Sequence, residues 1–405
     1  MNEGNQFEGR NPGEPLAFDF AEQRRQVAKI RVVGIGGAGG NAVNRMIIDQ
    51  LKGVDFIAMN TDLQALEQNH APCRIQIGKN LTKGLGAGGN PEVGCKAVEE
   101  NKDAVIDGLA ESDMVFIAGG MGGGTGTGAA PLVAEIARDL GALTVGVVTK
   151  PFVFEGVRRS EKAEQGIRAL KENVDTLIVV PNQKLISLVE KNTPLDEAFR
   201  LADEILLHST KGISDVINIP GLINLDFADV KTVMHQMGDA LMGSSVGTGE
   251  NRARDAAEKA ISSPLIDDVS IGGAQGVLVN ITGGKEMSLN DINEATSVVY
   301  EAAGAEANII FGAVIDPSMN GDVRVTVIAT GFHRNGFHAP FMREQMGKSP
   351  KRSELMKAID VPVFQKLEME PLEQALGEIF GNDGGLTFTS KDDLNIPTFI
   401  RKQMD

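Results

Sequence analysis

The sequence contains few of the residues that build disulfide frameworks and zinc sites. Two cysteines and five histidines occur in 405 residues. Cys73 and Cys95 are too far apart for a C-x-x-C motif and too few for a disulfide framework, so we expect reduced thiols. Because the histidines are scattered as well, we expect no metal site built from protein side chains.

Long apolar runs and an excess of basic residues are also missing. No run approaches the ~18 apolar residues of a membrane span, and the segment Met1–Glu8 is acidic, unlike a signal peptide. We therefore expect a cytoplasmic protein that does not insert into the membrane. The formal net charge of −16 repels phosphates, which argues against nucleic acid as a partner. A bound nucleotide would depend on local N–H groups and a few basic residues.

Glycine, by contrast, is abundant. The ten residues Gly119–Gly128 contain seven glycines and two threonines, and they directly follow the apolar, strand-like stretch Met114–Ala118. Glycine lets the backbone take positive φ and turn successive N–H groups toward one point, and a following helix adds the positive end of its dipole. The segment predicts a phosphate-binding loop, to which Thr125 and Thr127 can add hydroxyl donors.

Two more glycine-rich segments accompany it. Gly34–Gly40 follows the strand-like Ile30–Val33 and matches G-x-G-x-x-G, with Asp55 near the place of a ribose-binding acid. Gly84–Asn90 is of a type that closes over a terminal phosphate, or is a mobile surface loop. Neither of the first two loops carries the Lys-Ser/Thr of a P-loop. Two phosphate-facing loops favour a nucleoside di- or triphosphate.

The pattern along the chain indicates the fold class. Apolar strands alternate with helical stretches between residues 30 and 180, with a helix expected at Asn41–Leu51, which indicates an α/β fold with a mostly parallel, Rossmann-like sheet. Apolar residues at helical spacing predict one long central helix, Pro194–Ile217. The smaller α+β domain expected after it has strands at Gly276–Ile281, Ile309–Ile315 and Arg324–Thr330 around the helix Ser288–Ala303.

Five separate motifs carry a family resemblance. They are Asn60-Thr-Asp62, Gly122–Gly128, Pro151–Glu155, Asn224–Asp229 and Asn395–Phe399. In this order and spacing they resemble the tubulin/FtsZ family of polymerising GTPases, and in particular its bacterial cell-division members. The sequence departs from the family pattern at Gly40 and Asn395, where Asn and Asp are common.

The resemblance implies a domain organisation. It places a GTP-binding domain at 26–193, the central helix at 194–219 and a C-terminal domain at 220–332. Polar, charge-blocked sequence predicts a disordered extension at 1–25 and a flexible linker at 333–392. The last segment, 393–405, is expected to be a partner-binding peptide.

The nucleotide contacts follow from the same resemblance. An aromatic residue of the central helix stacks on the base and a polar residue one turn later reads its edge, which implies Phe199 and Asp203. A carboxylate accepts both N1–H and N2–H of guanine, whereas adenine presents an acceptor at N1, so this pair favours GTP over ATP. Glu155 and Arg159 are implied to hold ribose and phosphate, or else form an ordinary surface pair. The other implied contacts are Gly36, Gly37, Asn41, Ala87, Gly88, Gly122, Gly123, Gly124, Thr125, Gly126, Thr127, Gly128 and Asn182.

The glycine loops contain no carboxylate that could orient a water for hydrolysis. The resemblance implies that Asn224, Asp226 and Asp229 supply it, acting on the nucleotide of the next subunit in a head-to-tail filament. A Mg²⁺ held mainly by phosphate oxygens is expected with GTP or GDP. The alternative for these residues is structural, because Asp226 suits a helix N-cap and first-turn acids complement the helix dipole.

The tail combines apolar anchors with a basic pair. Its candidate contact residues are Leu394, Ile396, Pro397, Phe399, Ile400 and Arg401. In the family this peptide binds membrane adaptors such as the actin-like protein FtsA, which implies a filament at the mid-cell division site on the inner face of the membrane. Two other interpretations stay open at this point: a nicotinamide dehydrogenase that uses the first glycine loop alone, and a tubulin-like scaffold that assembles without turnover.

Overall fold

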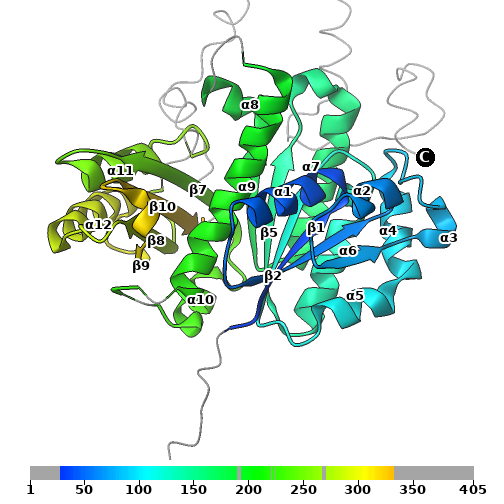
Figure 1. The fold of residues 1–405 in the computed structure, drawn as a ribbon, viewed down its shortest axis with the longest axis horizontal. Helices are drawn as coiled ribbons and strands as arrows, with labels where there is room; N and C mark the ends of the chain where they lie inside the picture. The colour runs from blue at the N-terminus through cyan, green and yellow to red at the C-terminus, as the bar shows by residue number, and fades with distance from the viewer. Residues whose placement is uncertain (1–27, 189–192, 220, 224, 267–270, 333–405) are drawn as a thin grey trace, which may run out of the picture. The chain divides into compact units, whose positions relative to one another are not determined.

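The computed structural model describes residues 28–332, with the exception of 189–192, 220, 224 and 267–270. These residues form one sheet of ten strands in the order β3-β2-β1-β4-β5-β6-β7-β10-β8-β9 (Figure 1). The strands are β1 Ile30–Ile35, β2 Val54–Asn60, β3 Cys73–Gln76, β4 Met114–Gly120, β5 Leu143–Lys150, β6 Thr176–Pro181, β7 Gly238–Gly247, β8 Gly276–Gly283, β9 Asn308–Ile315 and β10 Val323–Thr330. From β3 to β7 every pairing is parallel, and β10 pairs antiparallel with both β7 and β8. The predicted α/β fold with a mostly parallel sheet is confirmed.

Helices lie on both faces of the sheet. They are α1 Gly36–Ile48, α2 Leu63–Glu67, α3 Lys79–Thr82, α4 Pro91–Glu100, α5 Lys102–Leu109, α6 Thr125–Asp139, α7 Val157–Asn173, α8 Asn182–Leu185, α9 Leu195–Asn218, α10 Phe227–Met234, α11 Arg252–Ile261 and α12 Leu289–Ala303. Short 3₁₀ turns occupy Val153–Glu155, Ile186–Leu188 and Pro317–Met319. No helix in the described ranges is long and apolar enough to cross a membrane.

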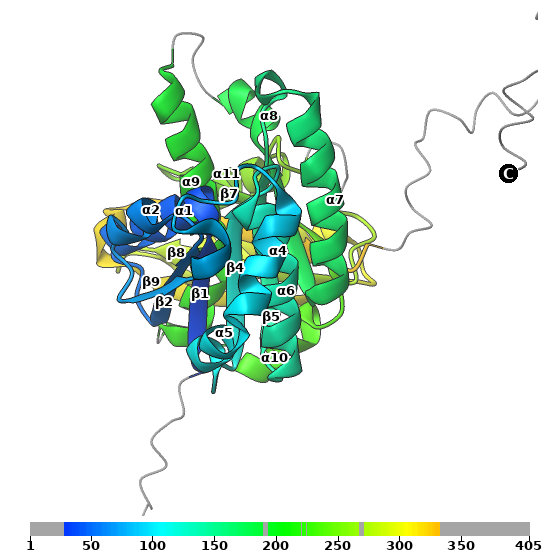
Figure 2. The ribbon, with the colours of Figure 1, turned by 90° about the vertical axis from the view of Figure 1, so that its right-hand side faces the viewer.

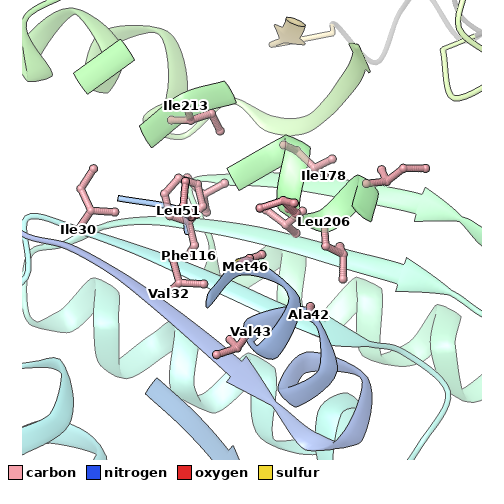
Figure 3. Packing of buried hydrophobic residues seen from close by; sticks show 14 of the residues in the cluster. Ile30, Val32, Ala42, Val43, Met46, Leu51, Phe116, Ile178, Leu206 and Ile213 are labelled. Carbon is pink, nitrogen blue, oxygen red and sulfur yellow. The ribbon is translucent and has the colours of Figure 1, made fainter. Parts of the chain in front are cut away.

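The central strands are apolar along their whole length because both of their faces are covered. Alternate side chains of one strand enter different cores: Val32 packs with α1 and α9, while Val33 packs with α4, α5, α6 and α7. Figure 3 shows the first of these cores, where Met46 of α1 and Leu206 of α9 meet Phe116 of β4. Figure 2 shows the opposite face of the sheet, covered by α4 to α7.

A third core lies in the C-terminal half of the described chain. Residues of α11, α12 and strands β8 and β10 form it, with Ala256, Val299 and Val325 fully buried. Ser288 begins α12 as predicted: its hydroxyl accepts the N–H of Asp291, whose carboxylate accepts the N–H of Ser288 in return. This reciprocal cap stabilises the helix start by about 1 kcal/mol. The division of the chain into domains stays a prediction.

The sequence prediction was wrong about where α1 begins. We expected a glycine loop followed by a helix at Asn41–Leu51, whereas α1 runs over Gly36–Ile48. The glycines are needed for packing inside the helix, not only for a loop. A Cβ at Gly39 would lie 2.4 Å from the carbonyl oxygen of Ala118, so only glycine lets α1 approach β4 this closely. Gly126 and Gly128 similarly belong to the first turn of α6.

Candidate nucleotide-binding site

The three glycine-rich segments meet at the carboxyl ends of the central strands. A Cβ at Gly36 would lie 3.0 Å from the backbone nitrogen of Gly126, which brings the first and second segments together. A Cβ at Gly124 would lie 2.8 Å from the Cβ of Ala87, which adds the third. Segments far apart in the sequence therefore lie in contact with one another and form one continuous surface.

The glycines of this surface fall into two groups. At Gly34, Gly39 and Gly128 an added Cβ would collide with backbone, for example 1.8 Å from the carbonyl oxygen of Pro91 in the case of Gly128. At Gly37, Gly88, Gly89 and Gly123 an added Cβ would meet nothing within 4 Å. The first group is explained by packing. The second group keeps space open above the loops, as a ligand that touches the backbone requires.

Two helix N-termini border this open space. Helix α1 begins at Gly36 and helix α6 at Thr125, directly after β1 and close after β4, and neither has a side-chain N-cap. The first N–H groups of a helix have no partner within the helix, and the dipole places partial positive charge there. Two uncapped helix starts beside open glycines suit the phosphates of a nucleotide.

The two threonines of the second loop also hold the loop in shape. Thr127 is buried, and its hydroxyl accepts the backbone N–H of Gly122 at 2.8 Å. The Thr125 hydroxyl lies 2.7 Å from that of Thr61, a residue that the sequence patterns did not single out for this site. Each of these hydroxyl groups already has a hydrogen-bond partner within the protein. A hydroxyl can make more than one hydrogen bond, so each can also contact a phosphate.

An aromatic cluster lies at the edge of the site. The rings of Phe199 and Phe152 meet edge to face with centroids 5.5 Å apart, and Phe152 stacks on Phe154 at 5.0 Å. Phe199 is 40% exposed although it is a large apolar side chain. An exposed ring held at a fixed angle by a second ring is a suitable surface for stacking a base.

Asp203 lies one turn after Phe199 on α9 and is partly buried. Burial raises the pKa of its carboxyl from 3.8 to about 7, an effect that nearby Arg45 opposes and Glu204 reinforces. Arg45 of α1 donates to Glu204 at 2.7 Å and so fixes the two helices side by side. A carboxyl whose ionised form lacks a strong partner gains most from a ligand that brings two N–H donors.

Glu155 and Arg159 flank the second loop. The Nε of Arg159 lies 3.1 Å from Glu155, whose other oxygen accepts the N–H of Phe152 at 2.8 Å. A Cβ at Gly122 would lie 2.7 Å from the carbonyl oxygen of Arg159, so this turn of α7 rests against the loop. The pair therefore lies against the second glycine-rich segment, and its contact with ribose and phosphate stays a prediction.

Asn182 has an unusual side-chain environment. It is 5% exposed, and its Oδ1 has no hydrogen-bond partner among the described residues. A buried carbonyl oxygen without a partner is costly and rare, and a bound water, ion or ligand is one explanation for it. The atom supports the expectation that Asn182 contacts a ligand.

Several amide side chains near the site were not predicted from the sequence as site residues. A pocket beside Gly36, Gly37 and Asn41 is also lined by Asn44, Asn60, Gln68 and Asn69. Asn41 and Asn44 are three residues apart and lie on one face of α1. This spacing was visible in the sequence, but the partners from β2 and the turn after α2 were not.

The acidic residues lie at the other end of the sheet. Helix α9 contains 24 residues and is therefore roughly 36 Å long at 1.5 Å per residue. Near its start Phe199 meets Phe152, just after β5, while near its end Asn218 bonds to the carbonyl of Gly53, just before β2. Asp226 and Asp229 follow this far end, in and before the first turn of α10. One chain does not bring them to its own glycine loops.

The alternative structural role of Asp226 finds no support in its contacts. Asp226 is the N-cap residue of α10, yet its side chain caps no N–H group of that helix. Asp226 and Asp229 are both exposed. The predicted partner Asn224 and the tail residues from Leu394 to Arg401 lie outside the described part of the chain.

The fold and the glycine-lined site define a class, that of α/β proteins that bind a nucleoside di- or triphosphate by backbone N–H groups. Two family models narrow this class. Residues 29–190 match "Tubulin/FtsZ family, GTPase domain", and residues 238–333 match "FtsZ family, C-terminal domain".

Solved structures agree with these matches. An empty FtsZ dimer from M. jannaschii is 46% identical, the match covers 76% of this chain and 89% of that chain, and the TM-score is 0.73. GDP-bound CetZ1 from Haloferax volcanii is 22% identical over 76% of this chain and 95% of that chain, with a TM-score of 0.66. A GTPgS-bound CetZ2 protofilament from the same organism is 20% identical over 86% and 99%, with a TM-score of 0.63. The two CetZ structures support the fold alone. The chain belongs to the tubulin/FtsZ family and is an FtsZ-like GTPase.

Proposed function

We propose that this protein assembles head to tail and hydrolyses GTP at the contact between two copies. The observation that carries the proposal is the separation of its two functional ends. The glycine loops lie at the carboxyl ends of the parallel strands, and the exposed acids Asp226 and Asp229 lie at the opposite end of α9. A contact that joins unlike ends produces an open filament when its rotation does not close into a ring.

Exposed apolar side chains at both ends support such a contact. Val153 and Phe154 beside the nucleotide site are 74% and 62% exposed, and Val157 follows them on α7 with 74%. Leu222, close to the acids, is 62% exposed. Side chains of this kind gain by burial against a second copy.

The division of labour between the two ends follows from charge. Backbone N–H groups of α1 and α6 stabilise negative charge on the phosphates, which is the larger part of phosphoryl-transfer catalysis. The acids of the next copy would orient the attacking water, with Asn224 assisting. The GTPase would then depend on assembly.

Mg²⁺ fits this arrangement as a companion of the substrate. No group of three His, Cys, Asp or Glu side chains that could hold a metal occurs in the described ranges. Phosphate oxygens would be its main ligands, with Asp226 and Asp229 nearby, and it would neutralise charge between acids and phosphates.

The decisive variant is Asp229→Ala. We expect GTP binding and filament formation close to wild type, with turnover lowered about 100-fold. Asp255→Ala, which removes a first-turn acid from α11, is the matched control. Turnover per subunit is measured against protein concentration together with light scattering. Normal hydrolysis in Asp229→Ala overturns the proposal.

The same measurement separates the other candidates. A non-hydrolysing scaffold would scatter light with GTP and release no phosphate, and a nicotinamide dehydrogenase would bind NAD without scattering. Turnover that is constant per subunit at every protein concentration would place the whole active site in one chain.

We further propose that the filament builds the bacterial division ring at mid-cell, on the inner face of the membrane. The support is the apolar and basic peptide Leu394–Lys402 at the end of a long polar segment, which suits capture by an adaptor such as FtsA. Deletion of residues 394–405 should abolish adaptor binding in a pull-down and leave GTPase activity intact. Adaptor binding by the truncated protein overturns this part of the proposal.

A further inference from the structure

The C-terminal end of α10 is anchored by hydroxyl groups of two different strands. The carbonyl of Val233 accepts the hydroxyl of Thr330 on β10 at 2.8 Å. The next carbonyl, that of Met234, accepts the hydroxyl of Thr176 on β6. The last carbonyls of a helix have no partner within it, so these two bonds replace missing ones and fix the direction of the helix end.

A third anchor follows immediately. Nδ1 of His235 lies 2.7 Å from Oδ1 of Asp175, the residue before β6. Asp175 is 2% exposed, and its Oδ2 accepts the backbone N–H of Thr144 at 2.9 Å. The contact brings the imidazole against a buried carboxylate oxygen that has no hydrogen-bond partner in the described chain.

The buried apolar side chains of α10 keep the helix on the core, but they do not fix its direction as these anchors do. Val230, Val233 and Met234 hold the helix against the core. Apolar burial is not directional, so it resists removal of the helix more than a small tilt or rotation. Hydrogen bonds to fixed partners do resist such changes. Helix α10 has eight residues, about 12 Å, so a tilt at its end moves the acids at its start.

We propose that His235 is a positioning residue for Asp226 and Asp229: by its 2.7 Å contact with the buried Asp175 it sets the direction in which α10 presents these acids to the neighbouring copy. This inference rests on the proposed function. Misplacement by about 1 Å is enough to cost a large factor in rate. Loss of His235 should therefore lower kcat while the distant nucleotide site keeps its affinity.

The test compares two substitutions of similar size. His235→Leu removes the polar contact with Asp175, and His235→Asn keeps an N–H near the position of Nδ1. We expect His235→Leu to lower turnover per assembled subunit about 10-fold, with GTP affinity and pelleted fraction within twofold of wild type, and His235→Asn to restore most of the rate. His70→Ala, which removes an exposed histidine, is the control.

A second variant serves if His235→Leu does not fold. Thr176→Val keeps the side-chain volume almost constant but deletes the hydroxyl group that donates to the backbone carbonyl of Met234. We expect about a threefold lower kcat with unchanged GTP binding. Wild-type kcat in His235→Leu, or in Thr176→Val if the former does not fold, overturns the positioning role. So does an equal loss of rate in His235→Asn and His235→Leu. Asp229→Ala is measured in parallel, because normal turnover there refutes the proposed function itself and not this step alone.

Discussion

Lys162 of α7 donates a hydrogen bond to the carbonyl oxygen of Gly89, with 2.6 Å between Nζ and O. It thereby links the helix that carries Arg159 to the third glycine-rich segment. Gly88 and Gly89 both have positive φ and open space where a Cβ would be. The ammonium group holds the segment at Gly89, on the side where a terminal phosphate is expected.

We therefore expect Lys162→Met to weaken GTP binding about fivefold and GDP binding less. The loss removes both the link to Gly89 and a positive charge near the terminal phosphate. Binding of fluorescent GTP and GDP is measured below the assembly threshold. Lys171→Met is the control, since Lys171 lies on the same helix and pairs with Asp239. An unchanged GTP-to-GDP ratio in Lys162→Met contradicts the prediction.

GTP binding should depend on pH through Asp203. With the pKa of this carboxyl raised to about 7 by burial, the free protein carries it protonated at pH 6 and ionised at pH 8. Guanine donors need the ionised form, so GTP affinity should rise with pH across this range and approach a tenfold change per unit below pH 7. Calorimetry at several pH values measures the affinity and the proton released on binding.

Substitution of this residue provides the matching specificity test. Asp203→Asn cannot accept both guanine donors, but its amide N–H can face the C2 carbonyl of xanthine. We expect weaker GTP binding without pH dependence, and a gain for xanthosine triphosphate. Asp196→Asn, in the exposed first turn of α9, is the control. A variant that retains wild-type affinity for GTP would remove Asp203 from base recognition.

Two glycine substitutions should affect different properties, one the stability of the fold and the other the affinity for GTP. Gly128→Ala places a Cβ 1.8 Å from the carbonyl oxygen of Pro91 and should lower the free energy of unfolding by about 3 kcal/mol. Gly123→Ala meets nothing within 4 Å, so stability should stay within about 0.5 kcal/mol while GTP affinity falls. Urea unfolding and nucleotide binding are measured for both variants. Destabilisation of both to the same extent would show that Gly123 also serves packing.

Asp215 should limit stability at neutral pH. Burial raises the pKa of its carboxyl from 3.8 to about 6, with Lys211 opposing this effect, Asp316 adding to it and Arg324 opposing it. His208 completes the group around a small polar cavity, and burial lowers the pKa of its imidazole to about 4, so it is neutral near pH 7. Between pH 4 and 6 the folded protein holds a proton on Asp215 that the unfolded chain has lost, so the contribution of Asp215 to stability falls as pH rises and stays lower above pH 6. His208 contributes with the opposite sign over this range, because its folded pKa is lowered, so the Asp215 part is read from the difference between variant and wild type.

Asp215→Asn should abolish this part of the pH dependence. We expect a gain over wild type of at most about 3 kcal/mol at pH 8 and little difference at pH 4. Urea unfolding at both pH values measures the difference, with Asp196→Asn as the exposed control. A variant less stable than wild type at pH 8 would mean that the ionised carboxylate has a favourable role in the cavity.

Much of the fold was readable from local patterns. Continuous apolar runs predicted the buried parallel strands, and helical spacing predicted α9 to within a residue at each end, since both periodicities reflect burial of one segment. The start of α1 was predicted wrongly, because a glycine required by close packing and a glycine required by a loop look the same in a sequence. The short edge strand β3 has too few residues to show a period.

The sequence by itself predicted a nucleotide-binding protein with three glycine-rich segments and placed its acidic residues in a different segment. Only the tertiary structure decided that those acids lie a full helix length away from the glycine loops. The tertiary structure also decided three contacts, which join Thr61 to Thr125, Lys162 to Gly89 and Asp175 to His235. The two residues of each pair are 60 to 73 positions apart in the sequence. Such contacts depend on how the strands are ordered in the sheet, and no local periodicity records that order.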